Sequence, residues 1–392
     1  MIIEIRKAWF VNKGAELMLH AAYWRMRQEY PGALLAMAPM GNVASMGPYA
    51  GFFKQAELGM LQKSWLWRYG LQWGDMVGLI PAKLRKRYGV VLDREIDVVL
   101  DAAGFSYSDQ WGVGSAVELA RSCRRWRKRG TKVVLLPQAM GPFESQKIKD
   151  AMNRAADHAD LIFAREQISY DHLIKAVGKR PNIKMAPDFT NLLEGVLPDY
   201  FPADSDRFCL VPNYRMIDKT SREQSKAYLP FMIKCAKLLQ AKGAPPFVLV
   251  HEGADDLMLA QEISKACGGE VEIITESHPL KIKGILGACR GTVGSRFHGL
   301  VSALSQGVPS LATGWSHKYR MLFEDYGFGE GILDIMAGED EIREKIDLIV
   351  EPDSRQQIQT TLNEKTHGFK QQSEQMWQEV IGLINAKSGG GD

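Results

Sequence analysis

Short apolar runs alternate with segments of helical period along most of this chain. In the first half, runs of strand length lie within "IIEIRKAW", "ALLAMAP", "IDVVLDAAG", "TKVVLLPQA", "DLIFARE" and "NIKMAPD". The segments between them carry helical periodicity over 14–30, 114–129, 144–158 and 166–177. Strands that alternate with helices are typical of a parallel sheet covered by helices. The pattern therefore predicts an α/β, doubly wound domain.

A second set of the same kind follows a break in the pattern. The break is "LLEGVLPDYFPADSDR", whose prolines, glycine and acidic residues show no period, as is typical of a linker. After it, runs of strand length lie within "FCLVPN", "FVLVHEG", "VEIIT", "GTVGS" and "VPSLATG". We therefore expect two Rossmann-like domains, over 1–195 and 206–336, followed by C-terminal helices and a tail over 337–392. A chain of 392 residues is long enough for two such cores.

Polar side chains gather where these strands end. In doubly wound folds, ligands bind outside the carboxyl ends of the parallel strands. Two such domains in tandem are expected to face each other across a cleft, and this cleft is where we look for the residues that bind ligands.

The loop after the first strand carries four candidate binding residues. In "FVNKGAELML" they are Asn12, Lys13, Gly14 and Glu16. A turn that contains glycine and leads into a helix can present backbone N–H groups to an anion or a sugar hydroxyl. An ordinary capped turn between strand and helix explains the same residues about equally well.

Three further loops of the first domain carry polar residues at strand ends. "DAAGFSYSDQWG" offers Ser106 and Tyr107, beside aromatics that would be a poor choice for open solvent, and "LLPQAMGPF" offers Gln138. Arg165 ends the strand of "FAREQIS", where its fork of donors matches a carboxylate or a phosphate. A salt bridge from Arg165 to Glu166 or Asp188 is the structural alternative.

The stretch "GTVGSRFHGLVSALSQGVPSLATGWSHKY", residues 291–319, has the densest set of such residues. Its apolar spacing predicts a strand, a helix and a second strand. Ser295, Arg296 and His298 then lie at the start of the helix, where a side-chain cation, an imidazole and the positive end of the helix dipole coincide. His317 and Lys318 add donors from the next loop. Together these groups favour a small, doubly anionic ligand.

Composition excludes several classes of protein and favours a cytoplasmic one. The net charge is +3, from 49 Lys and Arg against 46 Asp and Glu, which gives no indication of nucleic-acid binding. The five cysteines are scattered without CxxC spacing, as expected of reduced thiols in a core. We expect neither a signal peptide nor a membrane span, because no apolar run precedes a cleavage site or reaches 18 residues.

The sequence predicts no metal site and no cofactor. Its histidines lack HxH and HExxH spacing, and no cluster of aspartates offers the oxygen ligands that magnesium prefers. We therefore expect a reaction that is independent of metal.

Residues 51–89 form an insertion between the second and third strands. Trp65, Trp67 and Trp73 alternate with cations and precede "KLRKR", a mixture found in segments that lie at a lipid headgroup interface. A helical excursion that packs these aromatics on the first domain is slightly favoured. The basic run "RSCRRWRKRG" at 121–130 is most simply the solvated face of a covering helix.

The motifs together resemble the polysaccharide pyruvyl transferases. The resemblance rests on "SRFHGLVSALSQGVPSLATGWSHKY", "FAREQIS", "APDFTNLL", "LLPQAMGPF" and "NKGAELML", which span roughly residues 10 to 330 in the family's order. Two departures concern the half that would hold the acceptor: this chain has "DAAGF" where members often carry a run of glycines, and "NKGAE" where Asn-x-Gly-Asp-Glu is usual.

The resemblance implies a GT-B type fold, with two Rossmann-like domains facing across a cleft, and phosphoenolpyruvate as the donor. It implies a pyruvate ketal on a sugar of a cell-surface glycan or its lipid-linked precursor. The acceptor would bind the N-terminal domain and phosphoenolpyruvate the C-terminal one. A lipid-linked acceptor would also suit contact of 51–89 with the inner face of the membrane.

The resemblance also implies roles for the residues already noted. Arg165, Arg296 and His298 would lie at the donor site and take part in catalysis. The other residues that we assign to donor binding are Ser295, Gly299, His317, Lys318, Asn213 and Arg215. Those that we assign to acceptor binding are Asn12, Lys13, Gly14, Glu16, Ser106, Tyr107 and Gln138. A carboxylate and a phosphate on one donor explain why cations gather in 291–319, and His298 could be the acid for C3 or the base for a hydroxyl.

Two other functions fit the same pattern. A GT-B glycosyltransferase would place the diphosphate of a nucleotide sugar at the same helix start, with Glu324 or Asp325 as a partner for the ribose. The third interpretation is a glycan-binding protein without activity. An Arg and a His at a cleft argue against it. The acceptor sugar, the ketal stereochemistry and the oligomeric state are left open by the sequence.

Overall fold

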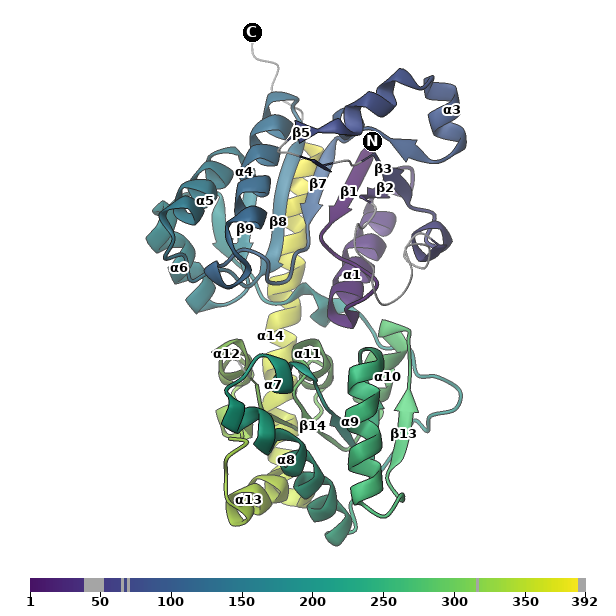
Figure 1. Cartoon of the computed structure of the whole chain (residues 1–392), viewed down its shortest axis with the longest axis vertical. Helices are drawn as coiled ribbons and strands as arrows, with labels where there is room; N and C mark the ends of the chain where they lie inside the picture. The colour runs from purple at the N-terminus through teal and green to yellow at the C-terminus, as the bar shows by residue number, and fades with distance from the viewer. Residues whose placement is uncertain (39–52, 65–66, 69–70, 315–316, 387–392) are drawn as a thin grey trace. The chain divides into compact units, whose positions relative to one another are not determined.

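The computed structural model describes residues 1–38, 53–64, 67–68, 71–314 and 317–386, and the side chains of 67–68, 71–75 and 317 lie outside that description. The chain forms two compact units (Figure 1). Unit 1 comprises Met1–Val11, Met18–Phe189 and Gln372–Asp392, and unit 2 comprises Asn12–Leu17 and Thr190–Gln371. Two short pieces thus group differently from the expected ranges, because the loop at Asn12 joins unit 2 and the chain from Gln372 joins unit 1.

Unit 1 is built on a parallel sheet of eight strands in the order β10-β9-β8-β7-β1-β2-β3-β6. The six predicted strands are present. β3, in the insertion, and β6, directly after it, were not predicted because three and two residues are too few to show a period. The strands are β1 (Ile2–Arg6), β2 (Leu34–Met37), β3 (Leu61–Lys63), β6 (Val90–Val91), β7 (Val98–Asp101), β8 (Lys132–Gln138), β9 (Leu161–Ala164) and β10 (Ile183–Met185). A separate antiparallel pair joins β4 (Trp67–Arg68) and β5 (Leu71–Gln72).

The helices of this half lie close to the predicted ranges. They are α1 (Lys13–Glu29), α3 (Ala82–Arg87), α4 (Val113–Lys128), α5 (Gln146–His158) and α6 (Gln167–Val177), with 3-10 turns η1 (Trp73–Leu79), η2 (Asp93–Glu95), η3 (Asp109–Trp111) and η4 (Phe189–Leu192). Local signals fix the ends of α6, for example. The Glu166 carboxylate accepts from Ser169 N at 3.0 Å, and Gly178 ends the helix at a φ of 78° that favours glycine.

Unit 1 contains a buried group of charges centred on Asp93. Lys63 Nζ lies 2.8 Å from Asp93 Oδ1, and Arg125 Nε and Arg129 Nη1 lie 2.8 and 2.9 Å from Oδ2. Burial alone would raise the pKa of Asp93, but Lys63 and Arg125 hold it well below its usual range. The reading of 121–130 as the solvated face of a covering helix holds for most of its cations, which are exposed, Arg129 included. Arg125 is half-buried instead, because the buried Asp93 carboxylate requires compensating cations.

Unit 2 contains a parallel sheet of five strands in the order β13-β12-β11-β14-β15. They are β11 (Phe208–Val211), β12 (Pro246–Val250), β13 (Glu272–Thr275), β14 (Gly291–Gly294) and β15 (Ser310–Ala312). The chain runs outward from β11 to β13 and then returns to the other side of β11 with β14. The carboxyl ends of β11 and β14 therefore flank a topological switch point, the place where doubly wound folds bind ligands.

The helices of unit 2 are α7 (Arg215–Asp218), α8 (Arg222–Ala241), α9 (Gly253–Ala266), α10 (Pro279–Ala288), α11 (Phe297–Leu304), α12 (His317–Asp325), α13 (Glu339–Val350) and α14 (Pro352–Asn385), with the turn η5 (Gly329–Gly331). α14 continues into unit 1. The strands β11, β12, β14 and β15 are buried along their whole length, as their near-continuous apolar sequences predicted. All five cysteines of the chain are buried thiols without a disulfide, as expected.

Candidate functional site

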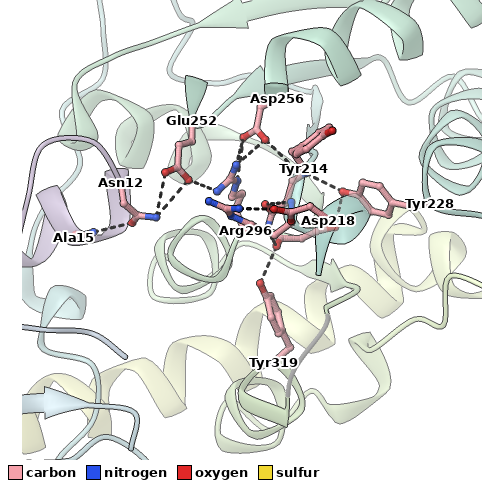
Figure 2. A network of polar contacts seen from close by, with 12 residues as sticks. Asn12, Ala15, Tyr214, Asp218, Tyr228, Glu252, Asp256, Arg296 and Tyr319 are labelled. Atoms are coloured by element: carbon pink, nitrogen blue, oxygen red, sulfur yellow. Dashed lines mark hydrogen bonds and ion pairs between the residues drawn. The ribbon is translucent and has the colours of Figure 1, made fainter. Parts of the chain in front are cut away.

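The best-defined group of polar residues in unit 2 lies where β11, β12 and β14 end (Figure 2). After β14 the chain passes through Ser295 to Arg296, whose extended backbone (φ −99°, ψ 114°) makes it the N-cap of α11. The predicted strand, turn and helix of 291–304 are thus confirmed.

The guanidinium of Arg296 is held by two carboxylates (Figure 2). Its Nε lies 3.0 Å from Asp256 Oδ2, its Nη2 lies 2.6 Å from both oxygens of Asp256, and its Nη1 is paired with Glu252. Asp256 is fully buried and Arg296 is 8% exposed. Burial raises the pKa of both carboxyl groups, and the guanidinium opposes that shift. Arg296 is thus a compensated charge rather than an open cation, and its contact with a donor stays a prediction.

The loop at Asn12 contributes to the same group. Asn12 Oδ1 accepts from Ala15 N at 3.0 Å and so caps α1, while Asn12 Nδ2 donates to both carboxylate oxygens of Glu252 at 3.3 Å (Figure 2). The capped turn considered from the sequence is therefore present, together with a contact to Glu252 that the sequence did not predict. We expected this loop to bind the acceptor. It lies instead in the same group as Arg296, which we expected to bind the donor.

His298 lies directly against this loop. A Cβ atom added to Gly14 would come within 2.1 Å of His298 Nδ1, so only glycine leaves room for the imidazole in this arrangement. Lys13 and Glu16 are both buried in the same turn, and Lys13 Nζ lies 2.6 Å from Glu16 Oε2. His298 therefore lies against a turn whose own charges are paired.

Hydrogen bonds fix the loop between β14 and α11 at Ser295. Its carbonyl accepts from Asn213 Nδ2 at 2.7 Å and from the Tyr319 hydroxyl at 2.9 Å, and its Oγ accepts from the Tyr228 hydroxyl at 2.8 Å. Tyr228 in turn accepts from Asn213 N at 2.9 Å. These bonds come from three elements, so the start of α11 is held rigidly for any group that binds there.

The remaining predicted donor residues occupy varied environments. Gly299 lies in the first turn of α11, and Lys318 Nζ lies 4.9 Å from the centre of the Phe297 ring. Arg215 Nη1 lies 2.5 Å from Asp218 at the surface. We expected His317 and Lys318 in the loop after β15, but they form the start of α12. The side chain of His317 lies outside the described part of the structure.

In unit 1, the predicted residues at strand ends surround Asp101. Tyr107 is buried and donates from its hydroxyl to Asp101 Oδ2 at 2.8 Å, and Gln138 Nε2 lies 3.3 Å from Asp101 Oδ1. Arg6 Nε lies 3.0 Å from the same carboxylate. Ser106 donates to Ala103 O at 3.3 Å. Contact of Tyr107 or Gln138 with an acceptor stays a prediction, since both have protein partners here.

Arg165 forms the salt bridge considered as its structural alternative. Its Nη1 lies 3.1 Å from Asp188 Oδ2, and both side chains are buried in unit 1. Glu166, the other partner considered, caps α6 instead. The pairing does not test whether Arg165 also contacts a donor.

A comparison with known families identifies the chain. A model of the polysaccharide pyruvyl transferase family matches residues 12–317, which include Asn12, Arg165, Glu252, Arg296 and His298. The chain belongs to the polysaccharide pyruvyl transferase family. The resemblance found in the sequence is thereby confirmed, and with it the assignment to a family of transferases.

The chain is also similar in fold to solved GT-B structures. Anabaena HepE in complex with UDP has 14% sequence identity and a TM-score of 0.59, over 97% of this chain and 100% of that one. The UDP-GlcNAc 2-epimerase of Neisseria meningitidis bound to UDP-GlcNAc has 9% identity and a TM-score of 0.58, over 97% and 99%. The structure of S. aureus MnaA with UDP has 10% sequence identity and a TM-score of 0.58, over 98% of this chain and 96% of that one. At such identities the similarity establishes the GT-B type fold of this pyruvyl transferase family member and nothing more.

Sequence reasoning missed several residues of the site. His251 and Glu252 directly follow β12, so the rule that led to Arg296 and His298 could have found them in "FVLVHEG". Asp256 lies on α9 and Tyr228 on α8, where the spacing of the sequence gives no sign of a contact with the end of β14.

The described residues contain neither a group of side chains placed to hold a metal ion nor a helix suited to cross a membrane. Within that part of this family member, no three or more His, Cys, Asp or Glu side chains are placed to hold a metal ion. No described helix is both long and apolar enough to span a bilayer.

Proposed function

We propose that this protein transfers the pyruvyl group of phosphoenolpyruvate to two hydroxyls of one sugar, in a cell-surface polysaccharide or its lipid-linked precursor. The product is a pyruvate ketal, and phosphate is released. The observation that carries the proposal is the family match over 12–317, which includes Asn12, Glu252, Asp256, Arg296 and His298. No resident cofactor or metal takes part in the proposed reaction.

The reaction needs proton transfers in both directions. C3 of the enol gains a proton and becomes a methyl group, both sugar hydroxyls attack C2, and the bond from C2 to the phosphate oxygen breaks. The two hydroxyls lose two protons, of which one balances the proton taken up at C3 and the other leaves on phosphate. An imidazole is suited to such a sequence because it can give or take a proton near neutral pH.

We assign the proton transfer to His298 and the anion to the start of α11. The N-terminus of a helix favours negative charge, so the first turn of α11 suits a phosphate or a carboxylate. Asp256 holds Nε and Nη2 of Arg296, while Nη1 faces Glu252. In this proposal the donor carboxylate shares that Nη1 edge or takes the place of Glu252.

Phosphate release from phosphoenolpyruvate tests the proposal directly. We expect release to depend on an added sugar acceptor, such as a lipid-linked or nitrophenyl glycoside, and to continue unchanged in excess EDTA, because the proposed chemistry uses only protein groups. Colorimetric assay of phosphate, with mass spectrometry of the glycoside for the added pyruvyl group, measures both. No release with any acceptor would count against the function. Loss in EDTA with recovery in magnesium or manganese would favour a glycosyltransferase instead.

A nucleotide-sugar glycosyltransferase is the second candidate. Anabaena HepE has been solved with UDP and with UDP-glucose, and it is similar in fold to this chain. A diphosphate would suit the same helix start. Titration with UDP and with phosphoenolpyruvate therefore distinguishes the two functions, since each candidate predicts that only one of them binds tightly.

We also propose that the insertion contacts the membrane peripherally. The evidence is a set of exposed apolar side chains that runs from η1 to the residue after α3. We name this set the insertion face, and it comprises Met76, Leu79, Ile80, Leu84 and Tyr88. Lys83, Lys86 and Arg87 are exposed in the same stretch. Apolar side chains beside cations match the interface of an anionic bilayer. Trp65 lies outside the described residues, as do the side chains of Trp67 and Trp73.

Vesicle flotation tests the insertion face. We expect the protein to float with phosphatidylcholine vesicles that contain phosphatidylglycerol, less so in high salt, and to lose most of this binding in the double variant Lys83→Glu and Lys86→Glu. Each basic residue near an anionic surface contributes about 1 kcal/mol. Lys370→Glu, an exposed change on α14, is the control and should float like wild type. Equal recovery with neutral and anionic vesicles would favour the packing alternative for this segment.

A further inference from the structure

His251 is a buried imidazole at the end of β12 with no role in the steps proposed so far. It is 5% exposed, and its Nδ1 has no hydrogen-bond partner among the described residues. Buried polar atoms are nearly always hydrogen-bonded, so an exception of this kind needs an explanation. An unmet donor or acceptor in a core costs stability, which suggests that it is kept for a ligand.

The His251 ring lies beside the first turn of α11. Its Cδ2 would be 3.5 Å from a Cβ atom on Gly299, at the third position of that helix. The hydrogen bonding within α11 begins with Leu300 N, which donates to Arg296 O at 2.9 Å. The backbone N–H groups before Leu300 therefore point out of the N-terminus, toward the side on which an anion would bind.

The groups around His251 keep its imidazole uncharged. Burial holds the pKa of His251 well below its usual range, and the cations Arg296, His298 and Lys13 lower it further. Among these, Arg296 is paired with Asp256 and Glu252, and Lys13 with Glu16. The imidazole is therefore neutral at neutral pH. In one tautomer it can donate from Nδ1 without adding a further charge.

We propose that His251 is a further donor-site residue, whose Nδ1 donates a hydrogen bond to a phosphate oxygen of a ligand held at the first turn of α11. A phosphate group offers several acceptor oxygens and so can accept from the helix N-terminus and the imidazole together. Only the naming of phosphoenolpyruvate as that ligand rests on the proposed function, because a nucleotide diphosphate would present the same group.

Calorimetric titration with inorganic phosphate, phosphoenolpyruvate and UDP tests the proposal on wild type and two variants. His251→Phe keeps a ring but removes the donor, and it should weaken binding of the phosphate ligand by about tenfold to a hundredfold. His251→Asn places an amide close to the former Nδ1 and should keep much of the affinity. The thermal stability of His251→Phe should equal or exceed that of wild type, because a buried polar atom without a partner is lost.

Thr292→Val is the matched control. The Thr292 hydroxyl on β14 is also buried and without a partner among the described residues, but it lies within a strand rather than at a strand end. This change should leave every affinity at the wild-type value. If His251→Phe does not fold, the imidazole nitrogen resonance of His251 in wild type, assigned with the Asn variant, should shift when phosphate is added.

The outcomes separate this inference from the proposed function. Wild type that binds UDP but not phosphoenolpyruvate, with weaker UDP binding in His251→Phe, would overturn the proposed function and support the role of His251. Unchanged affinity of His251→Phe together with lower stability would identify a purely structural histidine and overturn the inference. Absence of binding of all three ligands to wild type, or a His251 resonance that phosphate does not move, would overturn it too.

Discussion

Replacement of His298 by glutamine is expected to lower turnover by roughly two to four orders of magnitude while the affinity for phosphoenolpyruvate stays close to that of wild type. This is the usual range for the loss of a general acid or base. The His298 ring lies against Gly14, in the capped turn at Asn12, so it is placed beside the loop assigned to the acceptor hydroxyls. Steady-state kinetics of phosphate release gives turnover, and calorimetry gives the donor affinity.

Two other histidine variants complete this test. His278→Gln, at the cap of α10, should leave both constants unchanged, and His317→Gln should act mainly on the Michaelis constant. An inactive His317→Gln beside an active His298→Gln would move the chemistry to the start of α12.

Replacement of Arg296 by alanine is expected to lower transfer by about a hundredfold or more and also to destabilise unit 2. The loss of a charge-assisted contact to a reacting anion accounts for the rate. The stability changes because Asp256, which is fully buried, would keep its negative charge without a cation. Breaking a buried pair from one side typically costs about 3–5 kcal/mol. Denaturant unfolding of wild type and variant measures this difference.

A double variant separates the two effects of Arg296. Arg296→Ala combined with Asp256→Ala should recover part of the lost stability, because the fully buried carboxylate is gone and only the half-buried Glu252 is left without its cation, but it should stay inactive. Arg343→Ala removes an exposed pair with Glu339 in the same unit and should change stability by less than about 0.5 kcal/mol. Wild-type stability and turnover in Arg296→Ala would mean that neither role is right.

Much of the site could be expected from the sequence because its residues follow predicted strands. Arg296, His298 and Asn12 each come within a few residues of a strand end, and the structure brings all three into one group in unit 2. The sequence could not predict which other side chains form ion pairs or hydrogen bonds with these residues. The donors of Arg296 are taken up by carboxylates 40 and 44 residues away, so an arginine predicted as an open cation is a compensated one.

The sequence by itself determined the main strands of both sheets, the helices α1, α4, α5 and α6 of unit 1, and the family of this protein. Apolar runs such as those of β8 and β11, and the caps of helices such as α6, are local signals that depend on a few neighbouring residues. Only the tertiary structure decided which side chains meet: Tyr228 and Tyr319 at Ser295, Arg125 at Asp93, and His251 beside the first turn of α11. These contacts join distant segments. Their partners are set by the order of the strands and the packing of helices on the sheet, neither of which leaves a periodic trace in the sequence.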